Sequence, residues 1–217
     1  MCSRFYRTTD LKDLYGRYEI AEVIEVLGPQ SNIAPQDKAL IIPATAGKRI
    51  ADARVFGIIN PFIKEAKLML HMRAESLAAK PNFRPYLLNH RCLVIANGFI
   101  EWERRPIPGK KAKDSHPYRF DLRNGDMMSL AGIWVDEGFA IVTTEPNSLV
   151  EKYQERMAVI LRREDEAAWL DANNKDIGSL VTMLAPFPSK ALINAELPKA
   201  ISNSKNKSLD ALIPLAA

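Results

Sequence analysis

Short apolar stretches dominate the middle of the chain, and Gly, Pro, Asn and charged residues separate them. Their length and their content of Ile, Val and aromatic residues are typical of β-strands rather than of long helices. We predict strands over residues 38–44, 54–59, 91–103, 117–122, 127–135, 139–144 and 157–161. Apolar positions at helical spacing predict helices over residues 18–27, 61–71, 147–154 and 164–170.

Turn-forming residues refine this pattern. An Asn-Gly pair at 97–98 predicts a kink in the strand over 91–103. A second pair at 124–125 predicts a hairpin, because both residue types tolerate the positive φ angles of a tight turn. Residues 80–90 contain two prolines and are expected to form a loop. Residues 104–116 are basic and almost without apolar side chains, which predicts an exposed loop.

Several antiparallel-type strands with scattered short helices predict an α+β fold. We expect a curved, mostly antiparallel β-sheet or partial barrel with flanking helices. Residues 1–194 form the expected domain. Residues 195–217 become polar and low in complexity after Pro198, which predicts a loosely held C-terminal tail.

Composition adds little to this picture. Hydrophobic residues make up 47% of the chain, charged residues 26%, and the net charge is +4, which permits nucleic-acid binding without requiring it. The two cysteines, Cys2 and Cys92, form neither a disulfide framework nor a zinc motif. No apolar run reaches the roughly 20 residues of a membrane helix. We expect a monomeric, cytosolic protein, nucleoid-associated in a bacterium, without metal, cofactor or membrane anchor.

Cys2 is the first candidate for chemistry. We expect an aminopeptidase to remove Met1, because the next side chain is small. Cys2 would then carry a free amine and a thiol on adjacent carbons, with reference pKa values of about 8 and about 8.5. Such an aminothiol condenses with an aldehyde to a Schiff base and closes a thiazolidine ring. The alternative, from position alone, is an unremarkable residue at a frayed terminus.

An ordered series of short motifs follows Cys2. The chain begins Met1-Cys2-Ser3-Arg4-Phe5 and continues with these blocks: Asn32-Ile33-Ala34-Pro35, Arg73-Ala74-Glu75-Ser76, Arg91-Cys92-Leu93-Val94, Asn97-Gly98-Phe99-Ile100-Glu101-Trp102, Ala131-Gly132-Ile133-Trp134, Val142-Thr143-Thr144 and Glu155-Arg156-Met157. Each block is weak alone. Together, and in this order, the chain resembles the SRAP (SOS response-associated peptidase) family of abasic site processing proteins over residues 1 to about 194.

The resemblance implies a function and a set of site residues. It implies that Cys2 captures abasic sites in single-stranded DNA as a thiazolidine and shields the lesion in the DNA damage response. It also implies lyase-like chemistry and peptidase-like self-processing of Met1. Glu101 is the implied acid/base, and a half-buried carboxylate tends to have a raised pKa. The implied DNA-binding residues are Arg4, Asn32, Arg73 and Arg156.

Ordinary structural roles remain open for these residues. Glu101 and each arginine are also compatible with a solvated surface, and Asn32 with turn chemistry. Phe99 and Trp102 are candidates for base stacking or for core packing. The basic residues of 104–116 either attract DNA or only solvate a loop.

Two departures from the family affect the chemistry. His71 stands where the family has an asparagine, and Gln154 stands where it has its active-site histidine. If both side chains face one cavity, the imidazole and the carboxamide have exchanged places, and His71 takes over part of the proton transfer. The alternative is a divergent SRAP-like DNA-binding module with lost or weakened covalent chemistry.

Overall fold

The body of the protein is a ring of five strands. The computed structural model describes residues 3–59 and 67–216. The ring strands are β4 (Lys38–Pro43), β5 (Arg49–Phe56), β9 (Arg91–Ala96), β12 (Met128–Val135) and β13 (Gly138–Thr144). Neighbours in the order β13-β12-β9-β4-β5 are antiparallel. A parallel pairing of Gly138 and Phe139 with Val55 and Phe56 then joins β13 back to β5.

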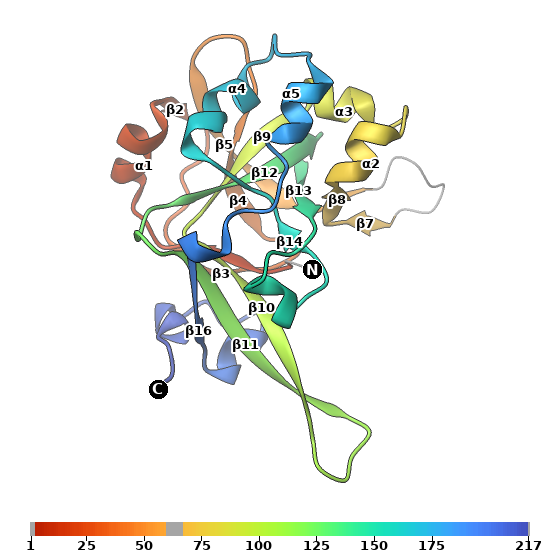
Figure 1. Cartoon of the computed structure of the whole chain (residues 1–217). Helices are drawn as coiled ribbons and strands as arrows, with labels where there is room; N and C mark the ends of the chain where they lie inside the picture. The colour runs from red at the N-terminus through yellow and green to blue at the C-terminus, as the bar shows by residue number, and fades with distance from the viewer. Residues whose placement is uncertain (1–2, 60–66, 217) are drawn as a thin grey trace.

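Both faces of the ring strands are apolar. All six residues of β9 are buried, as expected for a strand that is covered on both sides. Leu93 and Ile95 pack with the helices, whereas Val94 packs with the phenylalanines of a second sheet. The helices that cover the ring in Figure 1 are α1 (Leu11–Tyr18), α2 (Ala74–Ala79), α3 (Arg84–Asn89), α4 (Glu166–Leu170) and α5 (Ile177–Thr182).

The second sheet is antiparallel and extends away from the ring (Figure 1). Its order is β16 (Leu192–Glu196), β11 (Lys113–Leu122), β10 (Gly98–Pro106), β1 (Phe5–Arg7) and β3 (Gln30–Ile33). The remaining short strands are β2 (Ile20–Val23), β6 (Ile58–Ile59), β7 (Leu68–Met69), β8 (His71–Arg73), β14 (Met157–Ala158) and β15 (Ile160–Leu161). The 3-10 helices are η1 (Val150–Lys152), η2 (Arg163–Asp165), η3 (Ser189–Ala191), η4 (Lys199–Ser202) and η5 (Leu209–Leu212).

The predicted α+β class with a curved, mostly antiparallel sheet and flanking helices is confirmed. The predicted kink at 97–98 is larger than expected, because the chain leaves the ring there and enters the second sheet. The Asn97 carboxamide oxygen accepts hydrogen bonds from the backbone N–H groups of Thr8 and Thr9, at 2.8 and 3.1 Å. These bonds fix the crossing point against the N-terminal segment.

The predicted hairpin at 124–125 is wrong, because the strands on either side of the turn do not pair with each other. A turn does form, and Gly125 has a φ of 76°. However, β11 pairs with β10 and β16, while β12 pairs with β9, β13 and β15. The turn therefore links two sheets, a distinction that local turn chemistry does not encode.

Three further element predictions are corrected. The predicted helix over 18–27 is wrong, because Glu19 adopts the left-handed conformation (φ 53°) and ends α1, and β2 then pairs in parallel with β5. The helix predicted over 61–71 lies partly outside the described residues, and its described end forms β7 and β8 instead. The loop predicted over 80–90 contains α3, whose Pro85 lies in the first turn, where proline is tolerated.

The C-terminal segment is packed, so the expectation of a loosely held tail was wrong for residues 195–216. Leu197, Ile201 and Leu212 are at most 5% exposed and pack against Tyr6 and Ile100 of the second sheet. The polar composition of this segment does not indicate the packing, because a few well-spaced apolar residues are enough to dock short 3-10 helices onto a sheet.

Gly138 offers a test of ring closure. A Cβ atom at position 138 would overlap the backbone oxygen of Gly57, whereas one at Gly16 in α1 would meet nothing within 4 Å. We expect Gly138→Ala to lower the free energy of unfolding by about 2 kcal/mol or more, because a backbone oxygen cannot rotate away. The control Gly16→Ala should raise it by roughly 0.5–1 kcal/mol. Urea denaturation measures both, and equal values would contradict the closure.

Candidate functional site

A cleft of about 510 Å³ lies beside β10. Residues from five separate parts of the chain line it: Ser3, Arg4, Glu101, Trp102, Arg104, Ser115, Gln154 and Ser202. It therefore brings together the start of the chain, the β10–β11 hairpin, the segment after η1 and the end of η4. Seven of these eight side chains are polar or charged, and Trp102 is the exception.

The pairing of β1 with β10 places the start of the chain in this cleft. Phe5 pairs with Phe99, and the backbone N–H of Ile100 donates to the carbonyl oxygen of Arg4 at 2.9 Å. Ser3 continues in the same direction and lines the cleft beside Glu101. Cys2 itself lies outside the described residues, but its covalent neighbour is a wall of the site.

Glu101 is a buried carboxylate, 1% exposed, in register with Tyr118 of β11. Burial raises the pKa of Glu101 from 4.5 to about 7, because the charged form loses its hydration. A group with this pKa is present in both protonation states near neutral pH. Glu101 can therefore donate a proton and take it back within one reaction, which is the behaviour required of an acid/base residue.

The guanidinium of Arg4 is held at the cleft by the second sheet and the C-terminal segment. It donates to the Asn32 carboxamide oxygen at 2.9 Å and to the carbonyl oxygen of Ile201 at 3.2 Å. It also lies 5.7 Å from the centre of the Trp102 ring. The Trp102 indole in turn donates to the Ser202 hydroxyl at 2.9 Å. Arg4 is thus a pre-positioned cation in the wall of the site.

Asn32 is fully buried, with its side-chain amide donating to the carbonyl oxygens of Ile201, Asn203 and Asn206 at 2.9 to 3.0 Å. In the described structure it reaches the cleft through Arg4 rather than by lining it. The sequence prediction of a DNA-binding role for Asn32 stays a prediction. The observed contacts give this residue a positioning role.

Gln154 lines the cleft on the side of Glu101 and is half-buried. The preceding residue fixes the segment: the Tyr153 ring packs 4.8 Å from that of Tyr118, and Asn194 donates to the Tyr153 hydroxyl at 2.5 Å. The site thus has a carboxamide at this position, which can donate and accept hydrogen bonds but has no titration near neutral pH.

The remaining predicted residues lie on a neighbouring surface built by β8 and β13. The His71 ring meets Phe56 edge-on, with centroids 6.4 Å apart, on a strand that runs parallel to β13. Arg73 is exposed at the end of β8. Arg156 forms a two-pronged ion pair with Glu75, both contacts at 2.9 Å, and donates to the carbonyl oxygen of Thr143. Figure 1 shows β8 and β14 on the same side of the ring.

Sequence reasoning missed the lining contributed by Ser115, Arg104 and Ser202. The first two lay in a segment predicted as loop, and the third in the segment predicted as tail. Cys92 is fully buried, which raises the pKa of its thiol, as expected for an inert core cysteine. Phe99 is likewise core, whereas Trp102 is only partly buried.

Within the described residues, no three His, Cys, Asp or Glu side chains gather as a metal site would require. Within the same ranges, none of the helices has the length and apolar character to cross a bilayer.

Comparisons with known proteins match the whole chain. The family model for SOS response associated peptidase (SRAP) matches residues 1–204. Abasic site processing protein YoqW of Bacillus subtilis is 31% identical over 223 residues, covering 96% of this chain and 97% of that protein. Abasic site processing protein HMCES of Mus musculus is 22% identical, over 86% of this chain and 65% of HMCES. A solved structure from Bacteroides thetaiotaomicron has a TM-score of 0.81 at 23% identity, covering 99% of this chain and 100% of its own, which shows the fold.

From the raised pKa of Glu101 we predict how the free energy of unfolding depends on pH. Its proton is bound more tightly in the folded than in the unfolded protein, so this group stabilises the fold at low pH. That contribution is lost as pH rises from about 4.5 through about 7. Glu101→Gln cannot ionise, so between pH 5 and pH 8 we expect it to gain up to about 3 kcal/mol of unfolding free energy relative to wild type.

Urea denaturation at both pH values measures this difference. Glu151, an exposed carboxylate, supplies the matched control through Glu151→Gln. A difference between Glu101→Gln and wild type that stays constant with pH would show that the carboxylate is not desolvated.

Proposed function

Because the chain belongs to the SOS response associated peptidase (SRAP) family, we propose that it processes abasic sites in DNA by forming a covalent thiazolidine through Cys2. One observation carries this proposal: Ser3, which is bonded to Cys2, lines the same cleft as a buried carboxylate whose pKa is about 7. Consecutive Cα atoms are about 3.8 Å apart, so the residue before Ser3 starts within reach of that cleft.

The first chemical step is removal of Met1 by hydrolysis of its peptide bond. An aminopeptidase or the site itself supplies this step, and the product carries the free α-amine of Cys2. Without it the nitrogen remains an amide, whose lone pair is delocalised and does not attack an aldehyde. The peptidase-like activity in the family's description has this limited meaning in the proposal.

Ring opening exposes the reactive carbonyl of the lesion. The bond between C1′ and the ring oxygen of the abasic sugar breaks, and the ring oxygen gains a proton from protonated Glu101. The C1′ hydroxyl loses its proton to solvent water and becomes the aldehyde. Glu101 suits this step because its pKa near 7 leaves a large protonated fraction at neutral pH.

Covalent capture then proceeds without an oxidant or a metal. The amine of Cys2 attacks C1′, water leaves, and a Schiff base forms. The thiol sulfur adds to the carbon of the C=N bond, and the thiol proton moves to nitrogen. The net reaction joins aldehyde and aminothiol into a five-membered ring with release of one water. The Glu101 carboxylate takes the proton that the attacking amine loses, and the protonated carboxyl group then returns it to the C1′ hydroxyl, which leaves as water.

Cationic groups hold the phosphates on either side of the lesion. Arg4 is fixed in the cleft wall, and Arg104 lines the same cleft from β10. Arginine suits phosphate because its planar fork donates two hydrogen bonds at once. Arg73 and Arg156, on the neighbouring surface, extend the same role. We propose single-stranded DNA as the substrate, because an unpaired abasic nucleotide needs no extrusion to enter the cleft.

A second candidate is a DNA-binding module in which covalent chemistry is weakened. The observation in its favour is Gln154, which lines the cleft at the position where the family pattern has a histidine. A carboxamide transfers no proton near neutral pH. In this case the cleft and its arginines hold abasic DNA without forming a bond that survives denaturation.

Replacement of each cysteine separates these functions. Cys2→Ala should abolish the denaturant-stable adduct with a single-stranded oligonucleotide that contains one abasic site. Cys92→Ala, which removes the other thiol from a fully buried position, should retain it. The measurement is a denaturing gel, with intact-mass spectrometry to confirm loss of Met1. An adduct with Cys2→Ala would sink the proposal, and wild type that binds without an adduct would establish the second candidate.

A separate experiment tests whether His71 takes over part of the proton transfer, given that Gln154 replaces the family histidine. If His71 supplies part of the proton transfer, His71→Ala should slow adduct formation or reversal by up to about a hundredfold. It should also remove the part of the pH–rate profile that depends on an imidazole. Gln154→Ala should change the rate without changing that pH profile. Negligible and equal effects of both variants would remove His71 from the mechanism.

A further inference from the structure

The β10–β11 hairpin extends beyond the body of the protein as an arm, which we define as residues 103–116 (Figure 1). Its register runs from Glu103 opposite His116 to Pro106 opposite Lys113. At roughly 3.3 Å per residue, the arm extends about 20 Å from the cleft to its tip. That length corresponds to about six phosphates at 3.4 Å spacing along one strand of a duplex.

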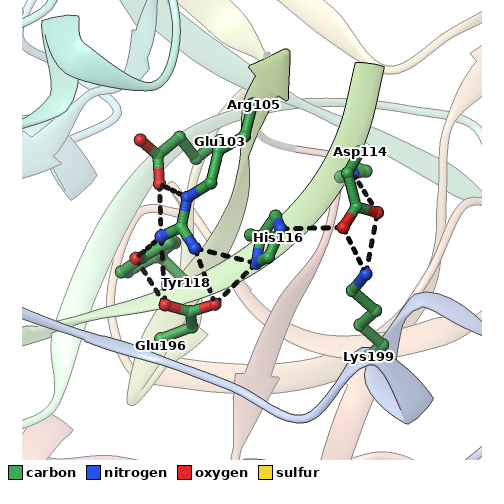
Figure 2. Close-up of polar contacts among 8 residues, drawn as sticks. Glu103, Arg105, Asp114, His116, Tyr118, Glu196 and Lys199 are labelled. Atoms are coloured by element: carbon green, nitrogen blue, oxygen red, sulfur yellow. Dashed lines mark hydrogen bonds and ion pairs between the residues drawn. The ribbon is translucent and has the colours of Figure 1, made fainter. Parts of the chain in front are cut away.

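One face of the arm is neutralised by a network of its own side chains and of side chains from β16 and η4. Figure 2 shows this network, which comprises Glu103, Arg105, Asp114, His116, Tyr118, Glu196 and Lys199. Arg105 contacts Glu103 at 2.7 Å and Glu196 at 3.1 Å, and Lys199 contacts Asp114 at 2.6 Å. The His116 ring bridges Glu196 and Asp114 at 2.7 and 2.9 Å.

Two carboxylates of this face, Asp114 and Glu196, have pKa values below their ordinary range, and hydrogen bonds from Lys199 lower that of Asp114. Hydrogen bonds from Tyr118 and His116 lower the pKa of Glu196 to about 2. Three carboxylates therefore stand against Arg105 and Lys199, with His116 between them. This face carries no surplus of positive charge, and a polyanion gains nothing from it.

The opposite face and the tip of the arm have a different character. Side chains alternate along a strand, so Arg104 and Lys113 point away from the network. Both are exposed, as are Lys110 and Lys111 at the tip. Among the residues that the structure describes, no ion pair joins any of these four cations to an acid. Arg104 and Ser115 of this face also line the cleft, so the positive surface is continuous with the site.

We infer that this basic face of the arm binds the DNA backbone on one side of the lesion, and so sets from which side the strand enters the cleft. The inference rests on the proposed function for the nature of the ligand. The arm is separate from the reacting groups, and its cations stand in a row from Arg104 to the tip. Such a row fits the regular charges of a phosphodiester backbone and has no pocket that would select a base.

The geometry makes the binding one-sided. A strand centred on the cleft meets the arm in one direction only, because the arm leaves the body on one side (Figure 1). DNA that extends from the lesion toward the arm gains the contacts with Lys110 and Lys111. DNA of equal length that extends the other way does not. The loss of affinity on removal of the arm charges must therefore depend on which side of the lesion carries the DNA.

The test uses the full chain with Cys2→Ala, so that binding is measured without covalent capture. The probes are fluorescent oligonucleotides with a stable tetrahydrofuran abasic analogue at one end, extended by about ten nucleotides on either the 5′ or the 3′ side. Fluorescence anisotropy gives Kd between 50 and 200 mM salt. The variant Lys110→Gln/Lys111→Gln is compared with Lys12→Gln/Lys48→Gln, which removes the same charge from exposed positions on α1 and before β5. Each probe is also tested with a complementary strand, which distinguishes single-stranded from duplex DNA as the ligand of the arm.

The expected result is a loss confined to one polarity. For that probe, the arm variant should reduce the slope of log K against log salt by about 1.4 when the DNA is single-stranded, or by about 1.8 when it is duplex. The control variant should leave the slope of both probes unchanged. Equal slopes for arm and control variants, or equal losses for both polarities, would overturn the inference. A parallel crosslinking assay with Cys2 intact reports on the proposed function, which can stand or fall independently of this result.

Discussion

Burial of the Glu101 carboxylate is the constraint on which the site depends. A charged carboxylate in a dry environment costs several kcal/mol, and the protein relieves this cost by letting the group hold its proton to about pH 7. Strand register contributes to that burial, since Tyr118 of β11 lies opposite Glu101, while Ser3 and Arg4, just before the chain's first strand, line the cleft beside it. The second sheet therefore does more than present side chains, because its pairing helps to bury the carboxylate and so to raise the pKa that the chemistry uses.

Arg4 and Asn32 connect this site to the end of the chain. Asn32 has no exposed surface and places its carboxamide between the Arg4 guanidinium and three backbone carbonyls of residues 201–206. A buried polar group of this kind is stable only when each partner is present. The position of Arg4 in the wall of the cleft consequently depends on the packing of the C-terminal segment.

The fold class, most ring strands and the chemical candidates follow from sequence, because strand periodicity and motif order are local properties. Sheet membership does not. The turn at Gly125 looks the same whether it closes a hairpin or links two sheets, and the choice depends on partners far away in the chain. The same division applies to the site. Sequence motifs identify Glu101 and Arg4 as site residues. Ser202 is not identified in this way, because it lies in a polar segment that reaches the cleft only when Ile201 and Leu212 pack against the second sheet.

The contact between residues 4, 32 and 201–206 also sets a sequence of events during synthesis. The wall of the cleft cannot be completed until the last part of the chain has left the ribosome, because its carbonyl partners do not exist earlier. Until that moment the guanidinium of Arg4 lacks its backbone acceptor at Ile201, and the amide of Asn32 lacks all three of its acceptors. The architecture thus makes the cleft a late product of synthesis, although one of its walls comes from the first residues to emerge.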